Sequence, residues 1–173
     1  MSLIVVDVEA DGAVPHLYSM VSFGAIVVEP SLSKTFYGQT RPISDDWQPE
    51  ALAVSNVSRE EHLTFDEPET VMREFKQWLT DNSKGKAVFI SDNLAFDWQW
   101  INYYFHRFTG GNPFGFSGRR IGDIYSGLVK DYFAGSKWKH LRQTQHTHHP
   151  VDDARGNAEA LLKIREMDFK FPF

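Results

Sequence analysis

The chain has 173 residues, of which 42% are hydrophobic, 14% aromatic and 24% charged, and its formal net charge is −5 at pH 7. This composition is too apolar for a disordered chain and too charged for a membrane protein, and the length suits one domain, which we expect to span residues 1–173. The absence of cysteine excludes disulfides, thiolate nucleophiles and cysteine-based zinc sites. The early apolar run at residues 3–6 is too short for a membrane span and lacks the basic flank and small-residue cleavage site of a signal peptide, so we expect a cytoplasmic protein.

The hydrophobic pattern divides the chain into strands and helices. Four segments have the pattern of strands: residues 3–8, 20–29, 34–40 and 86–91. Helices are expected at residues 48–56 and 58–63, in a segment that opens at Asp66 and Pro68 and ends before Gly85, and at residues 94–108, 123–133 and 152–167. This order predicts an α/β fold whose mixed sheet is antiparallel in its first three strands, then parallel, and is flanked by helices. The sequence has no GxGxxG or phosphate-loop motif, which argues against a dinucleotide-binding fold.

Positive charge is concentrated in one part of the chain. Residues 119–149 hold six Lys or Arg and two Asp, a balance of +4, so the other residues sum to −9. An acidic body with one basic segment suits a polyanion that is led to an acidic, metal-loaded site. The alternative is an ordinary solvated surface loop.

Two carboxylates end the first predicted strand. Asp7 and Glu9 project from the same face, because alternate strand residues share a face. Such a pair repels unless one group takes a proton or a cation lies between them, and hard cations such as Mg2+ and Mn2+ prefer oxygen ligands. Gly12 follows and allows close backbone approach. The pair indicates either an active site or a polar strand end exposed at the rim of the sheet.

Further polar residues lie where two helices begin. Asn93 and Asp97 follow the strand at residues 86–91, and Asp153 lies in the first turn of the last helix, after Pro150. Helix capping by Asn93 or Asp92, and the helix dipole acting on Asp97 and Asp153, explain these residues equally well. The histidines of the basic segment could form a zinc site or a surface cluster without a role: His140, His146, His148 and His149.

These motifs together resemble one group of enzymes. Asp-x-Glu on the first strand, Asn-x-x-Phe-Asp at a strand-to-helix junction and His-x4-Asp-Ala entering the last helix occur in the order found in the DEDDh group of 3'-5' exonucleases, which share a ribonuclease-H-like fold. The resemblance runs from residue 3 to about residue 165. It is closer to the small phage- and mycobacterial-type 3'-5' exoribonuclease family, on the segments SDNLAFDWQW (residues 91–100) and PVDDARGNAEALL (residues 150–162).

The resemblance implies a metal-dependent 3'-5' exonuclease that releases nucleoside 5'-monophosphates from the 3' end of single-stranded RNA or from 3' overhangs. It implies two divalent cations, Mg2+ or Mn2+, and allows a homodimer. The acids that it implies as metal ligands and catalytic groups are Asp7, Glu9, Asp97 and Asp153. His148, five residues before Asp153, is the implied general base. Ala10 and Asp11 stand where the family often has Thr, which removes a hydroxyl contact to the substrate, and Pro150 replaces a small residue in the loop of His148.

Aromatic and basic residues supply the candidate substrate contacts. Seven aromatic residues lie between residues 96 and 108; most form helical stripes typical of a core, whereas Trp98 and Tyr103 are better placed to stack on bases. Lysines and arginines of the basic segment could bind phosphates or be simply solvated. The full candidate set is Ala10, Gly12, Asn93, Trp98, Tyr103, Lys137, Lys139 and Arg142.

Three other functions compete with the exoribonuclease interpretation. A DNA exonuclease of the proofreading or repair type has the same motifs, because only a contact to the 2'-hydroxyl separates the two sugars. A nucleic-acid-binding module with an inactive site is disfavoured by the complete set of four acids and one histidine. A zinc protein built on the four histidines leaves the acids unexplained, and chelation should then unfold it instead of stopping turnover.

Overall fold

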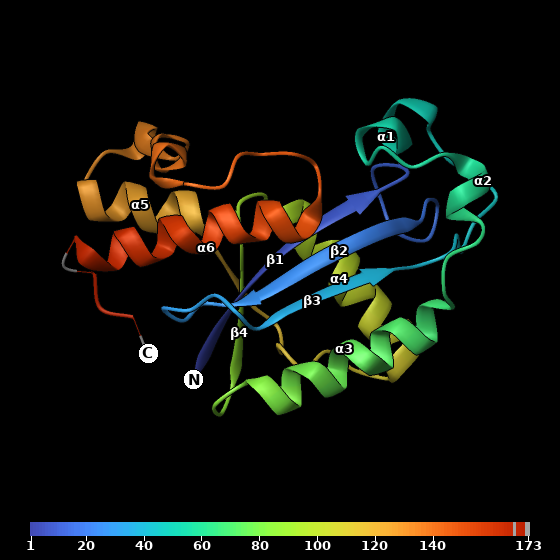
Figure 1. The fold of residues 1–173 in the computed structure, drawn as a ribbon, viewed down its shortest axis with the longest axis horizontal. Helices are drawn as coiled ribbons and strands as arrows, with labels where there is room; N and C mark the ends of the chain where they lie inside the picture. The colour runs from blue at the N-terminus through green and yellow to red at the C-terminus, as the bar shows by residue number, and fades with distance from the viewer. Residues whose placement is uncertain (168, 172–173) are drawn as a thin grey trace.

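A five-stranded mixed sheet forms the centre of the molecule, in a computed structural model that describes residues 1–167 and 169–171 (Figure 1). Its spatial order is β3-β2-β1-β4-β5. The strands are β1 (Ser2–Ala10), β2 (Met20–Val27), β3 (Thr35–Gln39), β4 (Ala87–Ser91) and β5 (Gly118–Arg120). The pairs β1–β2 and β2–β3 are antiparallel, and the pairs β1–β4 and β4–β5 are parallel. The predicted α/β fold with a mixed sheet is therefore confirmed.

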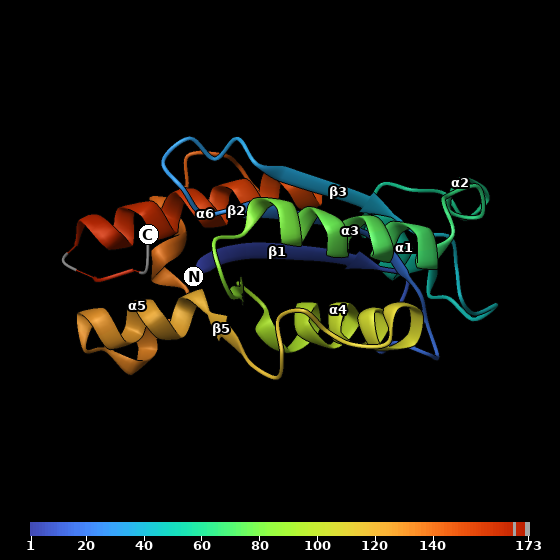
Figure 2. The ribbon, with the colours of Figure 1, turned by 90° about the horizontal axis from the view of Figure 1, so that it is seen from below.

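Helices cover both faces of this sheet. The α-helices are α1 (Pro49–Val54), α2 (Arg59–His62), α3 (Pro68–Asn82), α4 (Leu94–Thr109), α5 (Ile121–Val129) and α6 (Pro150–Glu166), and two 3-10 helices are η1 (Tyr132–Ala134) and η2 (Lys137–Leu141). One core lies between the sheet and α3 with α4, and a second lies between the sheet and α5 with α6. Both views place α1 and α2 at the end of the molecule opposite α5 (Figures 1 and 2). None of the helices in the described residues combines the length and apolar character needed to cross a bilayer.

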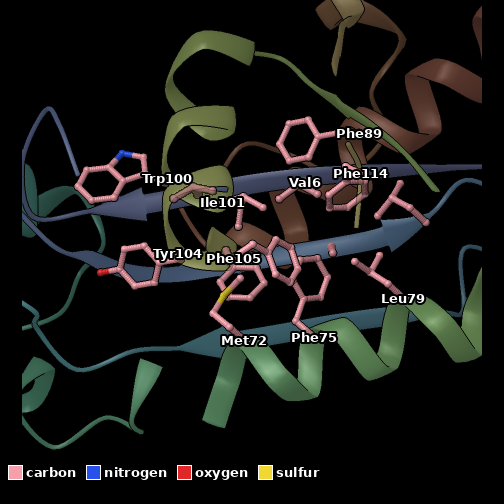
Figure 3. Close-up of a cluster of buried hydrophobic side chains, with 14 of the residues drawn as sticks. Val6, Met72, Phe75, Leu79, Phe89, Trp100, Ile101, Tyr104, Phe105 and Phe114 are labelled. Carbon is pink, nitrogen blue, oxygen red and sulfur yellow. The ribbon is translucent and has the colours of Figure 1, made fainter. Parts of the chain in front are cut away.

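The core under α3 and α4 is rich in aromatic rings. In Figure 3 the side chains of α3 point toward those of α4, and the rings of Phe75 and Phe105 stack with their centroids 5.4 Å apart. All seven aromatic residues between 96 and 108 lie in this core or pack against it. Trp100 and Tyr104 are fully buried. The helical stripes seen in the sequence are thus core, as their spacing indicated.

The basic segment differs from the predicted single helix over residues 123–133. Helix α5 begins earlier, at Ile121, and ends at Val129, because Lys130 has left-handed backbone with φ 57°. The chain then re-enters a short 3-10 helix, whose first turn is capped by Asp131 through a hydrogen bond from the Phe133 backbone N–H. Strand β5 and the 3-10 helix η2 were not predicted, since they are short and polar and lack a clear hydrophobic period.

Candidate active site

Three distant segments meet at one end of β1. On this strand Leu3 and Val5 lie in the core under α5 and α6, and Asp7 and Glu9 continue the same alternating row. Strand β4 runs parallel to β1 and leads into α4, so that Asp97 reaches β1 and accepts a hydrogen bond of 3.1 Å from the Val8 backbone N–H. The sheet order thus brings the predicted acid of α4 to the predicted acids of β1.

A glycine allows α6 to reach the same place. Gly24 of β2 is the register partner of Asp7, and a Cβ on Gly24 would lie 2.4 Å from the carbonyl carbon of Pro150. The first turn of α6 therefore lies directly on the sheet beside Asp7, and Asp153 in that turn is fully buried. One carboxylate oxygen each from Asp7, Glu9 and Asp153 lies within 4.8 Å of the others. The structure thus assembles the candidate acids that the sequence spreads over the whole chain.

Burial and mutual repulsion disturb the titration of these acids. Burial, and then the charges of Asp97, Asp153 and Glu9, raise the pKa of Asp7 well above its usual value. Burial, with a smaller contribution from Asp153, raises the pKa of Glu9 to about 7. Burial also raises the pKa of Asp97 to about 8, against the hydrogen bond from Val8, which lowers it. A cation bound among these carboxyl groups would stabilise their charged forms, which fits a site for hard divalent metals.

His148 lies over this cluster on the loop before α6. Its Nδ1 is 3.8 Å from Glu9 Oε1, and 44% of its side chain is exposed. Its backbone has φ 61°, a conformation that few residues other than glycine adopt. The carboxylate of Asp153 holds the loop in place, because it accepts hydrogen bonds from the backbone N–H groups of Thr147 (3.1 Å) and His148 (3.0 Å). Asp153 therefore faces the acids and also orients the histidine.

The four candidate histidines do not converge. His146 Nδ1 lies 2.8 Å from Asp153 Oδ1, and its ring centroid is 4.2 Å from that of His148. The ring nitrogen of His140 instead contacts the carbonyl oxygen of Lys137, and His149 lies against the Tyr37 ring. Among the described residues, the groups that could hold a metal ion include neither His140 nor His149. A zinc site built on all four histidines is therefore not formed.

The candidate substrate contacts near the acids have different surroundings. Ala10 is buried, and Gly12 lies under the Tyr18 ring, which leaves no room for a Cβ. Asn93 occupies the N-cap position of α4 and is exposed, and its side chain makes no capping hydrogen bond. Trp98 packs edge-on against Phe89, with ring centroids 5.2 Å apart, and lines a surface hollow of about 420 Å³.

The remaining candidate contacts already have protein partners. The Tyr103 hydroxyl accepts a hydrogen bond of 2.7 Å from Arg107. Lys137 pairs with Asp131 at 3.0 Å and Lys139 with Asp92 at 2.7 Å. Arg142 contacts the side-chain oxygen of Asn157, stacks 5.0 Å from the centre of the Trp138 ring and lies 3.7 Å from Asp92. Asp92 thus joins the basic segment and is not among the clustered acids.

A buried ion network, which the sequence did not indicate, fixes the chain directly after Glu9. Asp11 is completely buried and pairs with Arg59 at 2.9 Å, and His62 Nδ1 lies 3.7 Å from the same carboxylate. Asp11 also accepts a hydrogen bond of 2.5 Å from the Ser19 backbone N–H, which closes the turn between β1 and β2. Arg59 and His62 come from α2, so no local signal in the sequence links them to Asp11.

Fold and site together define the class of this protein. A mixed ribonuclease-H-like sheet that brings acids from β1, α4 and α6 together under a histidine is the arrangement of the DEDDh 3'-5' exonucleases, hydrolases that cleave phosphodiester bonds. More particularly, the chain belongs to the family of the 3'-5' exoribonuclease Rv2179c-like domain, whose model matches residues 2–165.

Known proteins similar to this chain are exonucleases. The 3'-5' DNA exonuclease Cap18 of Escherichia coli is 36% identical in an alignment of 179 residues, gaps included, which covers 95% of this chain and 92% of that protein. The nuclease domain of 3'hExo, a DEDDh family member bound to rAMP, superposes with a TM-score of 0.76 at 15% identity, over 95% of this chain and 92% of that one. E. coli exonuclease I, in a zinc-bound complex with single-stranded DNA, gives a TM-score of 0.72 at 18% identity, over 95% of this chain and 41% of that one. Both structures share the fold.

Proposed function

We propose that this 3'-5' exonuclease is metal-dependent, acts on single-stranded 3' ends and releases nucleoside 5'-monophosphates. The observation that carries the proposal is the approach of carboxylate oxygens from Asp7, Glu9 and Asp153 to within 4.8 Å of one another, with Asp97 hydrogen-bonded beside them. The single-stranded substrate is supported by the complex of exonuclease I with single-stranded DNA. Residues 1–173 act as one exonuclease domain in this proposal.

The acids would hold two divalent cations, Mg2+ or Mn2+. Their donor atoms are all carboxylate oxygens, which hard cations prefer. Burial first, and then neighbouring negative charges, raise the pKa values of Asp7, Glu9 and Asp97, so that the charged forms of these groups lack a counter-charge. When bound, such ions would supply activated water and would stabilise the negative charge that develops on the phosphate oxygens and on the leaving oxygen.

His148 is the proposed general base. Its partly exposed ring stands at the edge of the acid cluster, 3.8 Å from Glu9, where it can take a proton from the attacking water. The two backbone hydrogen bonds to Asp153 hold the loop, so the ring is positioned before the substrate arrives. A neutral imidazole accepts the proton at one nitrogen, and the departing 3'-oxygen later receives a proton from solvent.

The substrate contacts are proposed from the exposed surface and the existing partners of each candidate side chain. Asn93 offers an exposed amide that makes no capping hydrogen bond at the start of α4, four residues before Asp97. The hollow lined by Trp98 has apolar walls of a kind on which a base stacks. Phosphate contacts from Lys137, Lys139 and Arg142 stay a prediction, and each of these groups would have to exchange an acid for a phosphate.

RNA is the first proposed substrate and DNA the second. The family whose model matches residues 2–165 is described as an exoribonuclease, which favours RNA. The specific observation for DNA is the 36% identity to Cap18, a DNA exonuclease. A homodimer also stays a prediction, for which Phe116, Tyr132 and Phe133 supply the most exposed aromatic side chains of the described residues.

The test is hydrolysis of 5'-labelled RNA and DNA strands of identical sequence, single-stranded and in duplexes with 3' or 5' overhangs. We expect the wild-type protein with Mg2+ or Mn2+ to shorten strands from the 3' end and to release 5'-monophosphates, and EDTA to stop it. Asp7→Asn should be inactive, whereas Asp152→Asn, which changes a half-exposed acid outside the cluster, should keep its activity. Equal activity of Asp7→Asn, or activity that survives EDTA, contradicts the proposal. The ratio of the two single-strand rates decides between RNA and DNA.

A further inference from the structure

His146 has no role in the proposed hydrolysis, yet it lies inside a second group of metal-ligating side chains. One ligand atom each from His146, His148 and Asp153 lies within 4.8 Å of the others. His146 Nδ1 is 2.8 Å from Asp153 Oδ1, and the two imidazole rings are 4.2 Å apart between centroids. This group shares Asp153 with the acid cluster and adds two imidazoles to it.

The ligand atoms of this group favour a different metal ion than those of the acid cluster do. Zn2+ binds imidazole nitrogen and carboxylate oxygen, and three protein ligands leave one position open, as in many zinc sites. Mg2+ prefers carboxylates, carbonyls and water and binds imidazole poorly. A cation of the zinc type can therefore occupy this group while millimolar Mg2+ is present.

We propose that His146, His148 and Asp153 form a Zn2+ site whose occupancy inhibits the exonuclease. The inhibition rests on the function proposed above. An ion that binds the unprotonated ring nitrogen of His148 prevents this residue from accepting a proton, and it also coordinates Asp153. The ion can enter from solvent, because 51% of the His146 side chain and 44% of the His148 side chain are exposed.

The loop is prepared for such an ion. All three ligands lie within eight residues of chain, and the backbone N–H groups of Thr147 and His148 are already bound to the Asp153 carboxylate. Little of the chain therefore has to be ordered when the ion binds. His149 belongs to the same loop but lies against the Tyr37 ring and 3.9 Å from Asp152, so it provides a matched control.

The first experiment measures Zn2+ binding without substrate, by competition with a chromophoric chelator in millimolar Mg2+. We expect the wild-type protein to bind one Zn2+, and His146→Gln and His148→Gln to weaken binding at least about tenfold each, since each removes a ligand. His149→Gln should bind as the wild type does. With Co2+ in place of Zn2+, the visible absorption bands should likewise depend on His146 and not on His149. If His146→Gln binds Zn2+ with wild-type affinity, the proposed site is overturned. If Asp7→Asn also loses Zn2+ binding while His146→Gln keeps it, the ion lies among the acids instead.

The second experiment adds Zn2+ to the Mg2+-supported hydrolysis, and each variant is compared with its own rate without zinc. We expect the Zn2+ concentration for half inhibition to rise at least about tenfold in His146→Gln and to stay unchanged in His149→Gln. Full activity of the zinc-loaded wild type overturns the inhibition. A protein that binds zinc in the stated pattern but hydrolyses no nucleic acid leaves the site standing and refutes the proposed function, so the two failures are distinguishable.

Discussion

Asp7→Asn should make the metal-free protein more stable, which is unusual for a change at a partly buried polar residue. An oxygen of Asp7 lies within 4.8 Å of oxygens of Glu9 and Asp153. Two unit charges at that distance repel by about 3.5 kcal/mol at an effective dielectric constant near 20. The charge of Arg142 and partial protonation relieve part of this repulsion. We therefore expect a gain of about 1–3 kcal/mol in the free energy of unfolding, or roughly 3–9 °C in melting temperature.

The gain should depend on pH in a defined direction. The pKa of Glu9 is raised from 4.5 to about 7 and that of Asp97 to about 8, so the folded protein holds protons that the unfolded chain has lost. The stability that these groups contribute is complete below pH 4, where both states are protonated, and is lost as the pH rises toward 8. The metal-free wild-type protein should thus be less stable at pH 8 than at pH 6, and Asp7→Asn should reduce this loss.

Urea unfolding in EDTA at pH 6 and pH 8 measures both effects. Asp152→Asn is the control, because Asp152 also lies in the first turn of α6 but is half-exposed and outside the cluster. Its change in stability should be within about 0.5 kcal/mol at either pH. Mg2+ or Mn2+ should stabilise the wild-type protein more than Asp7→Asn. If Asp7→Asn is less stable than the control at pH 8 in EDTA, the acids do not repel one another as argued. The argument that these acids bind cations then loses its physical basis.

Three further changes test the histidine, the packing of α6 and the buried network. His148→Gln should lower the turnover rate by about 10²–10⁴-fold while Mn2+ binding measured by calorimetry stays within a few fold, and unchanged turnover refutes the general-base role. Gly24→Ala places a Cβ 2.4 Å from the Pro150 carbonyl carbon, so it should cost about 1–3 kcal/mol of stability and most of the activity, whereas Gly127→Ala, with open space around its Cβ, should cost neither. Burial and the Arg59 charge lower the pKa of His62 to about 4. As the pH falls from 6.5 to 4, the protein should therefore lose up to about 3 kcal/mol of stability that the neutral form of His62 contributes. In urea unfolding over that range, the stability of His62→Leu should depend less on pH than that of the wild type.

Local patterns in the sequence predicted those parts of the site that depend on strand and helix periodicity. Asp7 and Glu9 were placed on one face by the alternation of β1, and the structure has them in the same row as Leu3 and Val5. The position of Asp97 in the first turn of α4 also followed from the sequence. The meeting of these acids with Asp153 came only from the resemblance to a family, since no periodicity relates residues so far apart.

Features that depend on contacts between distant segments were not predicted. Gly24 lies in the middle of a buried strand, and only its approach to Pro150 shows why a side chain is excluded there. The partners of Asp11 come from α2, so its burial could not be inferred from its neighbours. The end of α5 at Lys130 was missed because a lysine with positive φ carries no sequence signal of the kind that glycine gives.

The site concentrates unfavourable local energies that the two cores on either side of the sheet must offset. Asp7, Glu9 and Asp97 have raised pKa values, and His148 has a left-handed backbone held by hydrogen bonds to Asp153. The crowded acids and the left-handed backbone of His148 cost stability, whereas the aromatic core under α3 and α4 is closely packed (Figure 3). Replacing Asp7 by its amide should therefore leave the fold intact, which is why this variant can separate chemistry from stability.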